Sequence, residues 1–316
     1  MSTISERPSA SVLIWRVVLR NSRSLLIAYA VVTLILAALQ RSLIYHPHRV
    51  REVSAKELGW ETGRVVPLRV TVSDNAVLHG WHVLPPGRSA RDVRESDQEL
   101  KLGRPVVLFF SGNGGDRGGR SEWFEMLSEC GCDVFAFDYR GYAENEGAPS
   151  EAAFAADAQA IWKHLTTDRG VAANRIVLFG ESLGGGVAIR LASEACEAKT
   201  PPRGLIVRST FTSMVDVGSH HYPWLPVGLV LVDRYPSLER MPRVTCPLLV
   251  MHGQRDTIVP FEHGRRLFDA ALAKATTGIA KRFLDLPTSD HNDVATTAES
   301  AVRRALREFL SDIGQR

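Results

Sequence analysis

The chain has 316 residues, of which 45% are hydrophobic, and its formal net charge is +3 at pH 7. This length and apolar content suffice for one large core, and scattered basic residues without interleaved aromatics argue against a nucleic-acid-binding surface. The cysteines lack metal-ligand spacing and do not decide the redox compartment; they are Cys130, Cys132, Cys196 and Cys246.

An apolar run near the N-terminus, residues 25–39, predicts a membrane helix. As a helix it is about 22 Å long, short of a hydrocarbon core of about 30 Å. Extension to Tyr45 closes the gap, because Arg41 can snorkel and a tyrosine suits the interface. We therefore expect an N-terminal tail over 1–24 and a transmembrane anchor over 25–45. A cleaved signal peptide and a buried helix of the main domain are the alternatives.

Basic residues before this run indicate an orientation. Arg16, Arg20 and Arg23 precede it, and cytoplasmic flanks carry an excess of Lys and Arg. We expect a single-pass membrane protein whose main domain, residues 46–316, lies on the non-cytoplasmic, periplasmic side. Three basic residues beyond the run count against this orientation.

The main domain begins with two predicted strands, 65–72 and 76–83, joined by a turn at Asp74-Asn75. The charged stretch 85–104 has no apolar periodicity and predicts a surface loop. Strands and helices then alternate, which predicts an α/β fold with a mostly parallel, doubly wound sheet. The strands are expected at 106–110, 134–138, 175–179, 205–208, 247–251 and 282–286, with helices near 121–130, 151–166, 182–195, 261–274 and 297–310.

The third parallel strand runs directly into a Gly-x-Ser-x-Gly pattern at residues 180–184. A sharp strand-to-helix turn of this type exposes the serine hydroxyl above the sheet, so Ser182 is the predicted nucleophile. The backbone N–H of Leu183 then points toward developing negative charge. The alternative is a serine at an ordinary glycine-rich turn.

A serine nucleophile needs a base and an orienting carboxylate, in the order Ser, acid, His for this architecture. Asp256 follows the predicted strand 247–251, and His291 follows the last strand; we predict them as acid and base. Their alternatives are a turn-capping carboxylate and a solvated loop histidine. His252 lies in the buried run 247–253 that leads to Asp256 and is expected to be a packed neighbour. Other acids, Asp285, Asp290 and Asp293, lie too near His291 to come from a separate strand end.

A second oxyanion donor is expected after the first parallel strand, in the glycine-rich stretch 111–115. The backbone N–H of Asn113 is the predicted donor, with that of Gly114 as the alternative, or the stretch is only a flexible turn. No phosphate-binding loop pattern is present.

Taken in order, these motifs resemble the α/β-hydrolase superfamily, specifically its membrane-anchored serine hydrolases. Further matching stretches are Leu43-Ile44-Tyr45-His46-Pro47, Asp138-Tyr139-Arg140-Gly141-Tyr142 and His291-Asn292-Asp293. The resemblance covers about residue 43 to the C-terminus. It implies hydrolysis of carboxylic esters or thioesters without a cofactor or metal, as in protein depalmitoylases. A prolyl-oligopeptidase-like peptidase or amidase is the alternative activity, and a catalytically idle, membrane-tethered binding module is the alternative outside enzymes.

The segment 210–240 interrupts the alternation and is rich in aromatic and apolar residues. We predict a lid or pocket wall, with Tyr222 and Trp224 contacting an acyl ester or thioester substrate, including a lipid. Packing against the sheet edge or the membrane surface is the alternative.

Overall fold

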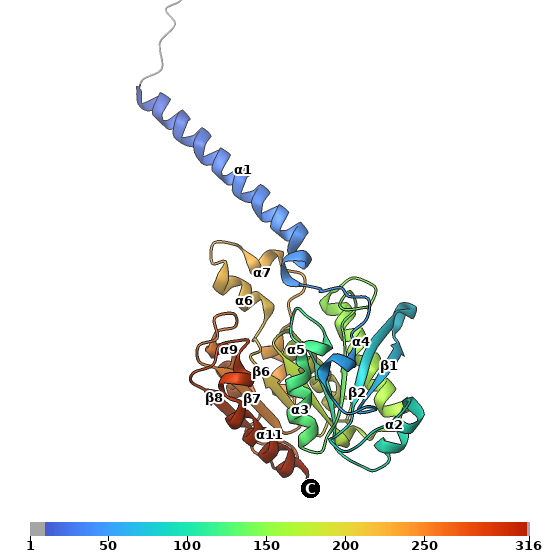
Figure 1. Ribbon diagram of the computed structural model, residues 1–316. Coiled ribbons are helices and arrows are strands. Elements are labelled where there is room, and N and C mark those ends of the chain that lie inside the picture. The colour runs from blue at the N-terminus through green and yellow to red at the C-terminus, as the bar shows by residue number, and fades with distance from the viewer. Residues whose placement is uncertain (1–9, 315–316) are drawn as a thin grey trace, which may run out of the picture.

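The computed structural model describes residues 10–314, which build an eight-stranded sheet between two layers of helices (Figure 1). The strands are β1 (Val65–Thr71), β2 (Val77–Val83), β3 (Val106–Phe110), β4 (Asp133–Phe137), β5 (Ile176–Glu181), β6 (Gly204–Arg208), β7 (Leu248–Gly253) and β8 (Arg282–Leu286). The helices are α1 (Ala10–Ile44), α2 (Val93–Leu100), α3 (Ser121–Glu129), α4 (Glu151–Lys163), α5 (Leu183–Glu197), α6 (Met214–His221), α7 (Val227–Val230), α8 (Ser237–Arg240), α9 (Phe261–Ala270), α10 (Val294–Thr297) and α11 (Glu299–Gly314).

The strand order is β1-β2-β4-β3-β5-β6-β7-β8. β2 pairs antiparallel with both β1 and β4, and all pairs from β4 to β8 are parallel. The predicted turn between the first strands is confirmed: Asp74 and Asn75 both have positive φ, 61° and 60°. The mostly parallel sheet predicted from the sequence is therefore confirmed.

The central strands are buried on both faces. In β3, Leu108 packs into one core with residues of α4 and α5, whereas Val107 and Phe109 pack into a second core with α3 and α11. Successive side chains of a strand point to opposite faces, so each apolar run serves both layers. This rigid centre fixes the loops at the carboxyl ends of the parallel strands.

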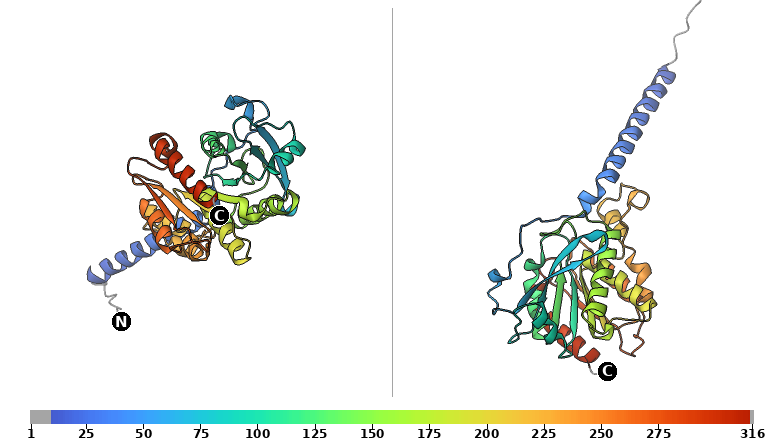
Figure 2. Two further views of the ribbon diagram at one scale, coloured as in Figure 1. Left: turned by 90° about the horizontal axis from the view of Figure 1, so that it is seen from below. Right: turned by 90° about the vertical axis from the view of Figure 1, so that its right-hand side faces the viewer.

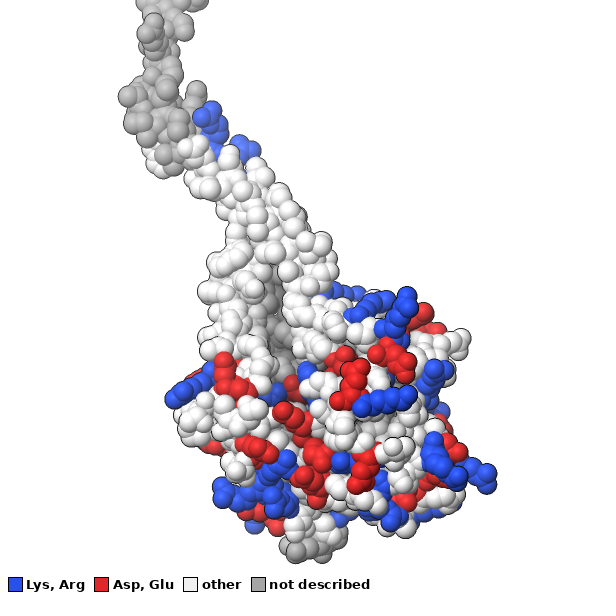
Figure 3. Space-filling view, in the orientation of Figure 1, with Lys and Arg blue, Asp and Glu red and all other residues white. Residues whose placement is uncertain are grey.

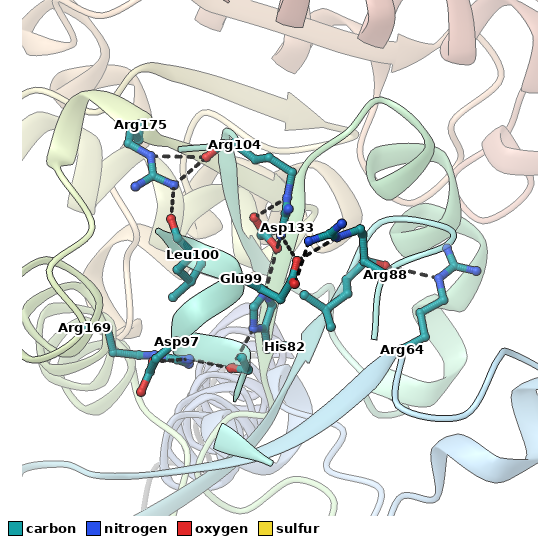
Figure 4. A network of polar contacts seen from close by, with 12 residues as sticks. Arg64, His82, Arg88, Asp97, Glu99, Leu100, Arg104, Asp133, Arg169 and Arg175 are labelled. Atoms are coloured by element: carbon teal, nitrogen blue, oxygen red, sulfur yellow. Dashed lines mark hydrogen bonds and ion pairs between the residues drawn. The ribbon is translucent and has the colours of Figure 1, made fainter. Parts of the chain in front are cut away.

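The predicted surface loop 85–104 is wrong in part, because it contains α2. Only Ser96 and Leu100 of this helix are buried, so its sequence has no apolar stripe. Polar contacts hold it instead (Figure 4): the Ser96 hydroxyl lies 3.0 Å from Nδ1 of His82, and the other ring nitrogen of His82 lies 3.0 Å from Asp133. Burial lowers the pKa of His82.

The long helix α1 leaves the body as a projecting rod (Figures 1 and 2). Its portion Arg20–Ile44, with a mean hydropathy of 2.0, is the one helix of the described residues that is long and apolar enough to cross a membrane. Tyr45, expected at the membrane interface, is instead packed into the core of the main domain and is 2% exposed. The apolar helix thus ends one residue before the domain core begins.

Residues 214–232, here called the cap, comprise α6, α7 and the loop between them. The cap rises from the body beside the base of α1 (Figure 1). It follows β6, which neighbours β5, the strand that leads to Ser182, so it stands at the carboxyl-terminal edge of the sheet.

Candidate active site

Ser182 lies at the turn between β5 and α5 in a strained backbone conformation, with φ 49° and ψ −113°. Such strain in a non-glycine residue persists only where the surrounding fold holds it. A side chain at Gly184 would collide with the backbone oxygen of Phe110, and one at Gly180 would collide with the first turn of α5. The two glycines therefore allow strand and helix to cross closely enough for this sharp turn.

His291 and Asp256 meet Ser182 at the same edge of the sheet. The Ser182 hydroxyl donates to Nε2 of His291 across 3.0 Å. Nδ1 of His291, in the tautomer that carries the proton there, donates to the Asp256 carboxylate at 2.8 and 3.0 Å. The three side chains come from loops after β5, β7 and β8, and they form one continuous chain of hydrogen bonds.

Asp256 is held as an anion by several donors. Its Oδ1 accepts hydrogen bonds from the backbone N–H groups of Ile258 and Val259, at 3.0 and 2.7 Å. Nε2 of His252 lies 3.3 Å from Oδ2, so this packed strand histidine supports the carboxylate. Burial acts to raise the pKa of Asp256, but the hydrogen bonds from His252 and His291 outweigh it and hold the pKa below its usual value.

Asp290 binds backbone N–H groups and does not contact the imidazole as Asp256 does. Its Oδ1 accepts the backbone N–H groups of Thr257 and His291, at 2.9 and 2.7 Å. It therefore ties the loop of the acid to the loop of the histidine and has no described contact with the imidazole.

Asn113 lies on the loop after β3. Its backbone N–H has no described hydrogen-bond partner, whereas its side chain makes three hydrogen bonds. The side-chain oxygen accepts the His46 N–H at 3.0 Å and the Tyr142 hydroxyl at 2.7 Å, and its nitrogen donates to the Ile44 oxygen at 2.5 Å. The side chain thus fixes this loop to the end of α1. The N–H of Leu183 opens α5, at a position where a helix has no internal acceptor for it.

A buried ionic cluster next to Ser182 was not predicted from the sequence. Glu181 pairs with Arg208 at 2.8 Å and with Arg120 at 2.9 Å. Arg208 also donates to the backbone oxygen of His291, and Arg120 donates to that of Gly114. The cluster therefore links the residue before Ser182 to the loop of His291 and to the glycine-rich loop. Burial acts to raise the pKa of Glu181, but the two arginines lower it overall.

Tyr222 and Trp224 lie apart from this constellation, on the cap loop between α6 and α7. They are 54% and 53% exposed, and no described hydrogen bond, ion pair or ring contact joins them to Ser182, Asp256 or His291. The cap does touch the acid loop, because Nε2 of His221 lies 2.9 Å from the backbone oxygen of Ile258.

Comparisons with known proteins agree on the family to which the chain belongs. Residues 103–230 match the family described as serine aminopeptidase, S33. An uncharacterized protein of Mycobacterium tuberculosis is 39% identical over 287 residues, which are 91% of this chain and 92% of that protein. Lysophosphatidylserine lipase ABHD12 of Gallus gallus is 31% identical over 260 residues, 75% of this chain and 67% of the lipase. The chain belongs to the α/β-hydrolase superfamily. Its similarity to this lipase and to the matching family shows that the chain is an enzyme of the serine-hydrolase class.

Other relatives agree with this placement. The corresponding lipase of Danio rerio is 31% identical, and this chain spans 59% of its length. Esterase Pf2001 of Pyrococcus furiosus has the same fold, with a TM-score of 0.61 at 22% identity over 85% of this chain and 97% of the esterase. A monoacylglycerol lipase of Paleococcus ferrophilus aligns with a TM-score of 0.51 at 21% identity, over 67% of this chain and 96% of the lipase.

Proposed function

We propose that this α/β hydrolase is a membrane-anchored serine esterase or thioesterase that acts through Ser182, His291 and Asp256. The observation that carries the proposal is the unbroken hydrogen-bonded chain from the Ser182 hydroxyl through the imidazole to the Asp256 carboxylate. Nucleophile, base and orienting acid are within hydrogen-bonding reach of one another, as acyl transfer to serine requires.

In the proposed mechanism, the Ser182 oxygen attacks the acyl carbonyl while Nε2 of His291 takes the hydroxyl proton. Asp256 holds the imidazole in its reactive tautomer and stabilises the imidazolium. The N–H groups of Leu183 and Asn113 donate to the oxyanion. His291 then returns the proton to the leaving alcohol or thiol, and a water molecule, activated by the same imidazole, hydrolyses the acyl-enzyme.

The proposed substrate is an acyl ester or thioester with a lipid-like chain. The similarity to lysophosphatidylserine lipases favours a single-chain phospholipid ester as the first class to test. Tyr222 and Trp224 are proposed to contact the acyl chain along its route to the site. A peptidase or amidase activity is the second candidate, favoured by the description of the matching family as serine aminopeptidase.

Membrane attachment is proposed through α1. Its exposed apolar surface and its basic N-terminal flank favour a single-pass anchor with the hydrolase domain on the non-cytoplasmic side. A protease-protection assay on spheroplasts tests the side: the domain is expected to be cleaved from outside without lysis, and protection of the domain would reverse the orientation.

The activity is tested by measuring acyl esters of graded length, acyl thioesters and aminoacyl amides with the wild type and with Ser182→Ala. We expect ester or thioester turnover that falls by about 10⁴-fold or more in the variant. Amide turnover exceeding both would establish the second candidate instead.

A further inference from the structure

The cap runs alongside α1 and is bonded to it at two levels. The Tyr29 hydroxyl donates to the backbone oxygen of Trp224 across 2.9 Å. Nearer the body, the Gln40 side chain donates to the oxygen of Val230 at 3.2 Å and accepts the N–H of Val232 at 2.7 Å. The two levels are about three helical turns apart, or about 16 Å along α1. The cap therefore accompanies the helix well beyond the surface of the body.

Neither the cap nor α1 carries a charged side chain along their contact. Residues 217–232 of the cap and 24–40 of α1 contain no Asp, Glu, Lys or Arg. Figure 3 shows them as two white columns that rise from the charged body with a hollow between them. Large apolar side chains are exposed on the cap, with Leu229 87% and Val232 64% exposed. An apolar surface of this extent on a soluble face would be unusual.

Charged residues begin at the same level on the cap side and on α1. Asp233, the first charged residue after the cap, pairs with Arg41 at 3.0 Å and accepts the Tyr45 hydroxyl at 3.1 Å. The cap and α1 thus become charged at the same level. From Arg23 to Arg41 the helix rises about 27 Å, close to the hydrocarbon thickness of about 30 Å.

The loops of the candidate active site lie directly below this border. The Asn113 side chain is bonded to Ile44 and His46, at the end of α1. At the other side, His221 of the cap contacts the loop that follows Asp256. The end of the anchor and the end of α6 therefore attach to the loops that hold the proposed oxyanion donor and the proposed acid.

We propose that residues 217–232 of the cap lie in the lipid leaflet beside α1, and that the enzyme takes its substrate from this leaflet by way of the hollow between them. The inference rests on the proposed membrane anchoring and ester hydrolysis. A lipid leaflet matches this surface, because residues 217–232 of the cap are uncharged and end at the same charged border as α1, a helix suited to span a bilayer. A single-chain amphiphile then keeps its acyl chain between cap and α1 while its ester, at the polar border, reaches Ser182.

The depth of the cap is tested on the full-length protein in phosphatidylcholine nanodiscs, with lipids brominated in their acyl chains as quenchers of tryptophan fluorescence. Bromination should quench the wild type more than Trp224→Phe, and the difference reports on Trp224 alone. Equal quenching of both proteins, in a preparation that resists carbonate extraction and hydrolyses p-nitrophenyl acetate, would overturn the cap proposal. In that outcome the proposed membrane anchor and the proposed esterase activity would be unaffected.

The substrate route is tested with Leu229→Asp, assayed on a single-chain ester embedded in vesicles and on soluble p-nitrophenyl acetate. We expect at least a tenfold loss on the embedded ester and no change on the soluble one. Leu102→Asp is the matched control, because Leu102 is 57% exposed on the body and outside the cap; it should change neither rate. Unchanged turnover of the embedded ester by Leu229→Asp would contradict entry from the leaflet.

Discussion

Arg208 donates a hydrogen bond to the backbone oxygen of His291 across 2.7 Å. The same guanidinium pairs with Glu181, the residue before Ser182, at 2.8 Å. Glu181 and Arg208 are opposite one another in the register of β5 and β6, at the ends of both strands. One buried ion pair therefore sets the distance between the loop of His291 and the turn of Ser182.

Arg208→Gln should lower kcat by about tenfold or more while changing KM little, because the histidine loop loses its anchor and Glu181 keeps only Arg120. Loss of one partner of a buried charged hydrogen bond costs about 1–3 kcal/mol. Steady-state rates on a soluble ester check this, with a thermal melt beside them. Arg243→Gln is the control, since the Arg243–Glu197 pair lies on the surface. A lower melting temperature with unchanged kcat would mean that Arg208 serves only the fold.

Asp256→Asn should reduce kcat by about 10⁴-fold, because an amide favours the wrong histidine tautomer. Asp285→Asn is a suitable control, because Asp285 is an exposed residue bonded to Gln254 and distant from the imidazole in the hydrogen-bond network. Rates on p-nitrophenyl butyrate measure both. Equal losses in the two variants would remove Asp256 from its assigned role.

Removal of residues 1–39 should leave a folded and active domain, because the contacts of Gln40 with the cap and of Arg41 and Tyr45 with Asp233 remain. Removal of residues 1–46 should be much more damaging. Tyr45 is 2% exposed, and its hydroxyl is bonded to Asp233 and Tyr235. Gel filtration and thermal melts of the two truncated proteins compare them. Equal stability would show that Tyr45 adds nothing to the core.

Trp224→Ala should lower kcat/KM for medium-chain esters by about tenfold, or about 1.4 kcal/mol, because it removes apolar surface along the acyl chain. Acetyl esters should be affected much less and serve as the internal control. Rates across a series of p-nitrophenyl esters measure the effect. A uniform loss at all chain lengths would assign Trp224 to support of the cap and not to substrate contact.

The fold was largely predictable because its signals are local. Strand and helix alternation, the turn at Asp74-Asn75 and the glycines around Ser182 each depend on a few neighbouring residues. The proximity of Ser182, Asp256 and His291 also follows, since parallel strands end at one edge of the sheet.

What the sequence did not reveal depends on partners far away in the chain. Tyr45 looks like an interfacial residue until Asp233 and Tyr235 are seen to enclose its hydroxyl. Helix α2 has no apolar stripe from which it could be predicted. Polar contacts with distant residues hold it against the sheet. Opposite charges at the ends of neighbouring strands, Glu181 and Arg208, were the available signal for the buried cluster, and only the strand order brings them together.

Labelling with a fluorophosphonate probe tests the central claim most directly. The full-length wild type should react at one serine, and peptide mass spectrometry should place the adduct on Ser182. Ser182→Ala should remain folded, since it loses a single oxygen, and should take up no label and hydrolyse no ester. An adduct on another serine, or ester turnover by Ser182→Ala above a tenth of the wild-type rate, would contradict the proposed mechanism.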